Sequence, residues 1–258
     1  SVSFIAKTAF IGCPKLRCIY VNPNNLKYAS FDKALFTKDL KTLLRFPPNS
    51  KITSYSIPKT VELFGMAFHS CSSLISIEIP QGTTKISKSA FDGCFHLSSV
   101  NISASVAKIS RLAFHNTRNL NNINVDENNP FYSSIDGVLF TKNLDRIIVY
   151  PSGKPNQLYS IPRQVRTISE NAFVSTSLVS INIPYGVKEI CENAFYFCHR
   201  LRSVSISSTV ESISNNSFNF RNLQSVSIAS QSIPLSLFKN YFANLTNSVE
   251  LTKCSDSS

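Results

Sequence analysis

A small residue followed by phenylalanine recurs along this chain at a nearly constant spacing. Neighbouring pairs lie 22 or 23 residues apart, except at two places where the gap is 58 or 59 residues. The pairs are Ala9-Phe10, Ala67-Phe68, Ala90-Phe91, Ala113-Phe114, Ala172-Phe173, Ala194-Phe195 and Ser217-Phe218. A fixed period of this length is typical of solenoids, in which each coil buries its apolar face only against its neighbours. The period therefore predicts a stack of coils.

One unit, residues 86–109, indicates which side chains point inward. A cysteine lies three residues after Phe91, a leucine six residues after it, and aliphatic residues nine and eleven residues after it. The alternation of Val100, Asn101 and Ile102 predicts a strand with the two aliphatic side chains inside and Asn101 outside. The four-residue step from Ile86 to the Ala-Phe pair suits a tight helical turn on the opposite wall. We expect the phenylalanines of successive coils to stack into an aromatic spine.

This phrase resembles the repeat of the BspA-like leucine-rich repeat family, also called the Treponema pallidum type. Its pattern A-F-x-x-C-x-x-L-x-x-I-x-I is followed closely by NAFYFCHRLRSVSI at residues 193–206, and the resemblance covers residues 2–228. Thr117, Thr176 and Arg221 replace the cysteine, and Ser217 replaces an alanine. The resemblance implies an α/β-type leucine-rich repeat solenoid of 22–23-residue coils. A parallel β-sheet would line its inner face, with short helical turns or strands opposite.

The two long gaps contain inserts, about residues 22–57 and 126–160, that resemble each other. With an offset of 104 residues, many pairs coincide, among them Asn25/Asn129, Tyr28/Tyr132, Leu35/Leu139, Phe36/Phe140, Lys38/Lys142 and Pro58/Pro162. Asp136-Gly137 predicts a tight hairpin turn, whereas Asp32-Lys33 in the first copy requires a different turn or a strained residue. We expect each insert to be a β-hairpin that leaves the solenoid. Its aromatic side chains that stay exposed are candidate anchors for a partner.

The chain is predicted to be one solenoid over residues 1–252, because nothing in it reads as an interdomain linker. Residues 229–252 are irregular and apolar, as expected of a C-terminal capping region, and residues 253–258 are expected to be disordered. The first residues already fit the end of a repeat, so we expect a processed form or a piece of a longer protein. No run of apolar residues approaches the length of a spanning helix, so membrane insertion is not expected.

The positions of the cysteines indicate buried core residues rather than catalytic or metal-binding ones. Cys13, Cys71, Cys94 and Cys198 all lie three residues after the phenylalanine of their unit, where a buried free thiol acts as a small apolar side chain. No cysteine or histidine spacing is typical of a zinc site, so we expect no metal and no cofactor. Motifs for nucleophilic catalysis or phosphate binding are missing, and acidic residues are scattered. The sequence predicts a protein that is not an enzyme.

Outward strand positions of successive coils form the first candidate binding surface. They are small and polar, which suits hydrogen bonding to a protein or a glycan, but solvated strand residues would look the same. The candidates are Tyr20, Ser76, Glu78, Ser99, Asn101, Asn122, Asn124, Ser180, Asn182, Ser203 and Ser205.

Positive charge is the second surface feature, with a formal net charge of +11. We expect a basic row that would attract polyanions such as sulfated glycans or acidic protein surfaces, or would simply be solvated. Its members are Lys85, Lys108, Arg166 and Lys188. No recognition motif accompanies the charge, so nucleic acid is not an expected partner.

The family resemblance implies a non-enzymatic binding module of a cell surface or secreted protein that attaches to host extracellular proteins or other cells. The repeats alone predict only an extended binding scaffold. An intracellular scaffold or regulator of protein interactions is the alternative, because the thiol positions follow no disulfide pattern and suit a reducing compartment.

Overall fold

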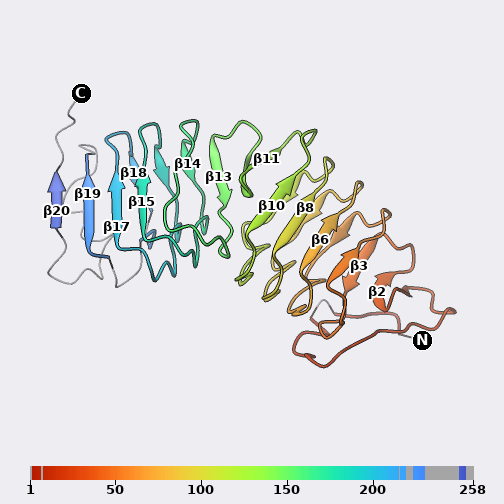
Figure 1. Cartoon of the computed structure of the whole chain (residues 1–258). Helices are drawn as coiled ribbons and strands as arrows, with labels where there is room; N and C mark the ends of the chain where they lie inside the picture. The colour runs from red at the N-terminus through yellow and green to blue at the C-terminus, as the bar shows by residue number, and fades with distance from the viewer. Residues whose placement is uncertain (1, 7, 215, 219–222, 230–249, 254–258) are drawn as a thin grey trace. The chain divides into compact units, whose positions relative to one another are not determined.

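The computed structural model describes residues 2–6, 8–214, 216–218, 223–229 and 250–253. The chain forms two compact units, Ser1–Tyr132 and Ser133–Ser258, with the same internal plan. Every regular element within the described residues is a β-strand, and the strands of each unit lie side by side in Figure 1. The opposite wall of each coil is therefore built from short strands and turns. No helix able to cross a membrane occurs in these residues.

Two sheets form the walls of the first unit. The four-stranded sheet, in the order β10-β8-β6-β4, is parallel and carries the Leu-x-x-Ile-x-Ile strands. Its strands are β4 (Ser54–Ser56), β6 (Ser76–Ile79), β8 (Ser99–Ile102) and β10 (Asn122–Val125). The six-stranded sheet has the order β1-β2-β3-β5-β7-β9. Its strands are β1 (Tyr28–Phe31), β2 (Ala34–Thr37), β3 (Thr42–Arg45), β5 (Leu63–Phe64), β7 (Lys85–Ile86) and β9 (Lys108–Ile109).

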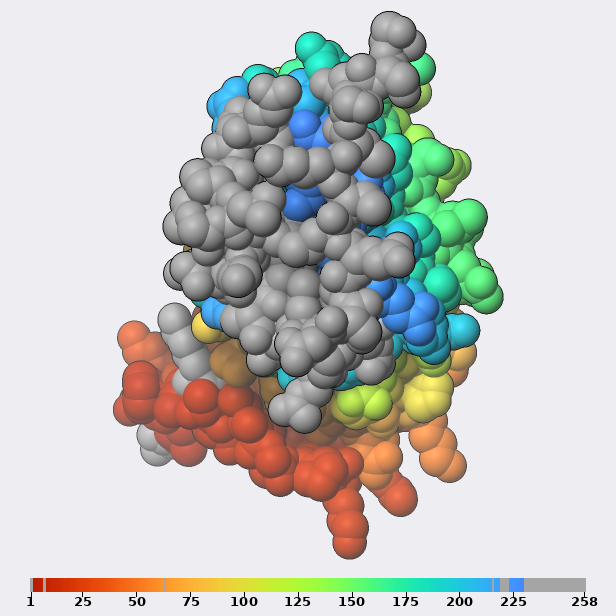
Figure 2. Space-filling view, turned by 90° about the vertical axis from the view of Figure 1, so that its left-hand side faces the viewer, coloured from red at the N-terminus to blue at the C-terminus, as the bar shows by residue number. Residues whose placement is uncertain are grey.

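The second unit repeats this arrangement. Its six-stranded sheet contains β11 (Tyr132–Ile135), β12 (Val138–Thr141), β13 (Arg146–Val149), β14 (Thr167–Ile168), β16 (Glu189–Ile190) and β18 (Ser212–Ile213). Its parallel four-stranded sheet contains β15 (Ser180–Ile183), β17 (Ser203–Ile206), β19 (Ser225–Ile228) and β20 (Glu250–Lys253). Figure 2 views this unit from its C-terminal end, where atoms of the last described coil are blue.

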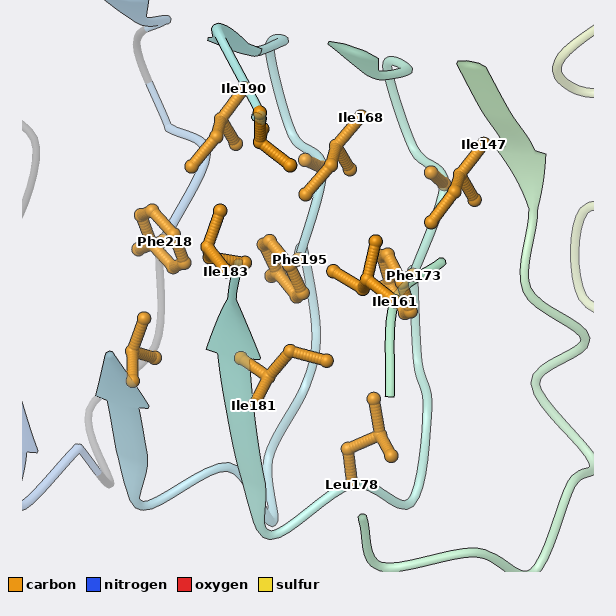
Figure 3. Close-up of a cluster of buried hydrophobic side chains, with 14 of the residues drawn as sticks. Ile147, Ile161, Ile168, Phe173, Leu178, Ile181, Ile183, Ile190, Phe195 and Phe218 are labelled. Atoms are coloured by element: carbon orange, nitrogen blue, oxygen red, sulfur yellow. The ribbon is translucent and has the colours of Figure 1, made fainter. Parts of the chain in front are cut away.

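An aromatic spine runs between the two walls of each unit, as the sequence predicts. In the second unit the rings of Phe173 and Phe195 stack at 4.8 Å, and those of Phe195 and Phe218 at 5.0 Å (Figure 3). In the first unit Phe91 lies between Phe68 at 5.4 Å and Phe114 at 5.6 Å. These separations match the strand spacing of about 5 Å, because the strands and the rings repeat with the same coil.

The spine continues into both inserts, which the Ala-Phe pattern did not predict. Phe46 is buried and its ring lies 5.3 Å from that of Phe68, while the ring of Tyr150 stacks on Phe173 at 5.1 Å. Their backbone N–H groups donate to the carbonyls of the next coil, as those of the other spine residues do. The residue before each ring is Arg45 or Val149 rather than alanine, so the Ala-Phe pattern does not mark these two coils. Each insert thus contributes a complete coil.

The predicted hairpins are present, but they do not leave the solenoid. Strands β1, β2 and β3 pair in antiparallel order, and β3 then pairs in parallel with β5. The hairpin therefore extends the six-stranded sheet. It stays there because Ala34, Leu35 and Phe36 are buried, and a hairpin projecting into water would expose them.

Both hairpins have a two-residue turn with left-handed backbone at both central positions. The φ angles are 50° and 74° at Asp136 and Gly137, and 47° and 65° at Asp32 and Lys33. This is the type I′ geometry that matches the twist of the strands. Lys33 is therefore the strained residue that the sequence allowed for, since its Cβ is crowded at positive φ.

Lys33→Gly should raise the free energy of unfolding by about 0.5–1 kcal/mol, because glycine removes the strain at positive φ and loses part of the gain as chain entropy. The reverse change in the second copy, Gly137→Lys, should lower it by a similar amount. Urea unfolding followed by circular dichroism measures both. A destabilised Lys33→Gly protein would mean that the lysine side chain has a stabilising contact.

Two expectations about the N-terminal part of the chain change. Cys13 is exposed, whereas Cys71, Cys94 and Cys198 are buried as predicted. Tyr20 is exposed but lies in no strand, because β4 is the edge of the four-stranded sheet and the segment of residues 16–22 does not join it. The predicted capping region and tail lie outside the described residues, apart from Ala229 and β20.

Candidate binding surface

The predicted outward residues of the first unit form two columns across the four-stranded sheet. Ser76, Ser99 and Asn122 are in register, and so are Glu78, Asn101 and Asn124. The Asn124 side-chain amide donates to the Asn101 carbonyl oxygen at 2.8 Å. The alternation of inward aliphatic and outward polar residues places them there, because strand side chains point to opposite faces in turn.

The second unit carries the equivalent columns. Ser180, Ser203 and Ser225 are in register on β15, β17 and β19, and the Ser225 hydroxyl donates to that of Ser203 at 3.0 Å. The other column contains Asn182, Ser205 and Ser227. With small side chains throughout, this face lets a ligand approach the sheet closely.

A hollow of about 600 Å³ opens at the end of the second column. Asn182, Ser205 and Ser227 form its floor, and Arg163, Arg166 and Tyr185 also line it. Tyr185 is 76% exposed. No aspartate or glutamate is among the residues that line the hollow in the described part of the chain. The site thus combines hydrogen-bonding groups, two cations and one aromatic ring.

A tight turn holds the rim of this hollow in place. Gly186 has a φ of +105°, and its N–H donates to the Thr209 hydroxyl at 2.9 Å. The Arg166 guanidinium donates to the carbonyls of Arg163 at 3.0 Å and Gly186 at 3.4 Å. A Cβ at Gly186 would approach the Arg166 Nη1 to 2.5 Å, so only glycine permits this placement. The Pro-Tyr-Gly sequence after the strand is a signal for Tyr185, although the repeat pattern alone does not point to this residue.

The four residues of the predicted basic row occupy two different positions in the repeat. Lys85 and Lys108 begin β7 and β9 and are register partners. Arg166 and Lys188 each precede the equivalent strand of the second unit by one residue. Lys188 forms a salt bridge with Glu211, and Arg166 contacts backbone carbonyls. They form two separate pairs rather than one equivalent column, because Lys108 lies two residues after the valine of its coil, whereas Arg166 and Lys188 lie one residue after theirs.

The insert aromatics divide as expected between packing and exposure. Phe36, Phe46, Phe140 and Tyr150 are buried, whereas Phe31 and Phe131 are 51% and 50% exposed. Burial raises the pKa of Tyr150 to about 12, in keeping with a phenol inside the spine.

The buried thiols have no chemical environment that would activate them. Burial raises the pKa of Cys198 to about 11 and also raises that of Cys71, so both stay protonated at neutral pH. The Cys94 and Cys198 thiols donate to backbone carbonyls of the spine, those of Phe68 and Phe173. No group of three or more potential metal ligands lies together within the described residues.

A comparison of the sequence with family models identifies a repeat family that is consistent with these coils. The model described as the BspA type leucine-rich repeat region, in six copies, matches residues 45–154 and 152–256. The chain belongs to the BspA-type leucine-rich repeat family. Such repeats are typically non-enzymatic protein-binding scaffolds. A comparison with curated proteins found no match.

Solved structures of other leucine-rich repeat proteins share this fold. A leucine-rich repeat protein from Eubacterium ventriosum is 18% identical, with a TM-score of 0.59, over 89% of this chain and 77% of that one. A leucine-rich cell surface protein from Faecalibacterium prausnitzii is 24% identical, with a TM-score of 0.50, over 76% of this chain and 64% of that one. At these identities the likeness establishes the fold alone.

Proposed function

We propose that this BspA-type chain is a non-enzymatic protein-binding module of a cell surface or secreted protein, and that it mediates attachment to extracellular proteins or other cells. The hollow in the second unit is the part of its surface that would contact the ligand. The cell surface description of the Faecalibacterium protein supports the proposed location.

One observation carries this proposal: the hollow places an exposed tyrosine and two arginines beside a floor of small polar residues. Tyrosine and arginine are the residue types that most often dominate the energy of protein interfaces. The floor residues Asn182, Ser205 and Ser227 offer hydrogen bonds without blocking close approach. By contrast, the polar columns alone lack an anchor, since serine seldom dominates binding energy.

Tyr185→Ala in the whole chain should weaken binding to immobilised extracellular matrix proteins, or to cells, by about tenfold or more, because an exposed aromatic anchor is removed. Arg163→Ala should weaken it in the same direction. The matched controls are Gln81→Ala and Lys59→Ala, which change the equivalent positions of the first unit. Surface plasmon resonance or cell binding measures each.

Equal affinity of wild type and Tyr185→Ala would refute the hollow as the binding site. Full competition by heparin, with no dependence on Tyr185, would favour a sulfated glycan as the ligand instead of a protein. Saturable binding that both second-unit variants reduce, and that both first-unit controls leave unchanged, would support the proposal.

A further inference from the structure

Arg45 breaks the pattern of small apolar residues in the core of the first unit. It occupies the position directly before the spine ring, where the following coils have Ala67, Ala90 and Ala113. The second unit has Val149 at the equivalent position. Arg45 is nevertheless only 4% exposed. A position built for a small apolar side chain therefore holds a large cation.

No described residue provides a counterion for this buried charge. One Nη atom donates to the Met66 carbonyl at 3.2 Å, while Nε has no hydrogen-bond partner. No salt bridge to Arg45 forms among the described residues. Burial lowers the pKa of the guanidinium from its usual value, but an arginine stays charged at neutral pH. A buried cation without an anion is costly, so an arriving carboxylate would meet a group that is poorly satisfied.

Arg45 lines a groove of about 850 Å³ along strands β3, β7 and β9 of the six-stranded sheet. Four further cations line the same groove: Lys85, Lys88, Lys108 and Arg111. None of its described lining residues is acidic. Lys85 and Lys108 lie directly opposite each other on neighbouring strands, an arrangement in which like charges repel. The groove is therefore a concentrated positive site.

The lining of the groove also includes apolar residues. Ile5, Phe10, Leu35 and Leu44 line it together with the cations. A sulfated glycan would match the charge but would leave these apolar residues without a partner, whereas a peptide with both acidic and aliphatic side chains would satisfy both. Charge and apolar surface together thus select the class of ligand.

We propose that this groove binds an acidic segment of a partner protein, with carboxylate and aliphatic side chains, and that one carboxylate pairs with Arg45. The site is independent of the hollow proposed above, because different residues in the other unit form that hollow. The second copy lacks the site: Val149 replaces Arg45, and Glu189 and Ser212 replace Lys85 and Lys108.

The test uses the whole chain and a short synthetic peptide that alternates glutamate with leucine. Wild-type protein should bind it saturably and should bind the glutamine counterpart much more weakly. Arg45→Val, which introduces the residue of the second copy, should weaken binding by at least about tenfold. Combined Lys85→Ser and Lys108→Ser changes should weaken it by about threefold to tenfold and reduce its salt dependence. The control Lys51→Ser removes one exposed lysine outside the groove and should leave the affinity unchanged.

Two further measurements keep the result interpretable. Arg45→Val should melt at or above the temperature of the wild type without peptide, and only the wild type should gain melting temperature when peptide is added. Tyr185→Ala should bind the peptide normally, which separates this site from the proposed adhesive hollow. Unchanged peptide affinity in Arg45→Val would overturn the proposal. Heparin binding stronger than peptide binding and equally dependent on Arg45 would also overturn it, in favour of a glycan site.

Discussion

Phe91→Ala should lower the free energy of unfolding by about 3–5 kcal/mol, the usual cost of truncating a buried aromatic residue. Phe91 has no exposed surface and stacks on Phe68 at 5.4 Å and on Phe114 at 5.6 Å. The change leaves a cavity that two neighbouring coils border, and a regular stack cannot close it without shifting both. Urea denaturation followed by circular dichroism measures the loss.

Phe131→Ala is the matched control for this change, because Phe131 belongs to the same unit and is half exposed. Its loss should stay near 1 kcal/mol or below, in proportion to the smaller apolar area removed from water. A loss below about 1 kcal/mol for Phe91→Ala would contradict a packed spine. Similar losses for both variants would show that stacking adds little.

Asn129→Ala should lower the free energy of unfolding by about 3 kcal/mol, because it leaves several buried backbone groups without partners. The Asn129 side chain is fully buried. Its amide donates to the carbonyls of Ser103 at 2.9 Å and Val106 at 3.0 Å, and its oxygen accepts from the N–H groups of Phe131 and Tyr132. This one residue thus fixes the start of the second insert to the preceding coil.

Asn25→Ala provides the internal comparison, since Asn25 occupies the same place in the first copy. Its amide donates to the Val2 carbonyl at 3.1 Å and its oxygen accepts from the N–H groups of Lys27 and Tyr28. Asn25 is only partly buried, so water can replace its hydrogen bonds and the loss should be about 1 kcal/mol. Equal losses at both positions would mean that burial does not govern the cost.

The inward positions were predictable because every coil repeats the same contacts. Ala90, Phe91, Leu97 and Val100 are all fully buried, as the repeat of one unit indicates. The Asn25/Asn129 coincidence likewise predicted that the inserts were copies, but not that the amide binds back to the preceding coil. That role depends on residues more than 20 positions away.

The spine residues Phe46 and Tyr150 were missed for a local reason. Recognition of the repeat relied on the small residue before the ring, and Arg45 and Val149 replace it. Only the backbone bonds to the next coil and the stacking distances reveal the equivalence. The predicted basic row divides into two pairs for a similar reason, because a shift of one residue in register moves a side chain to another position.

Taken by itself, the Ala-Phe period determined that this chain is a solenoid of 22–23-residue coils and which side chains form its interior. The period is sufficient because each coil packs only against its neighbours, so the sequence of one repeat specifies nearly all of the contacts in the core. The tertiary structure alone decided which residues share a candidate site: Tyr185 and Arg166 line one hollow with the polar strand residues, and Arg45 lines a basic groove. These sites depend on the register of coils about 20 residues apart and on the turns between them, which no single repeat encodes.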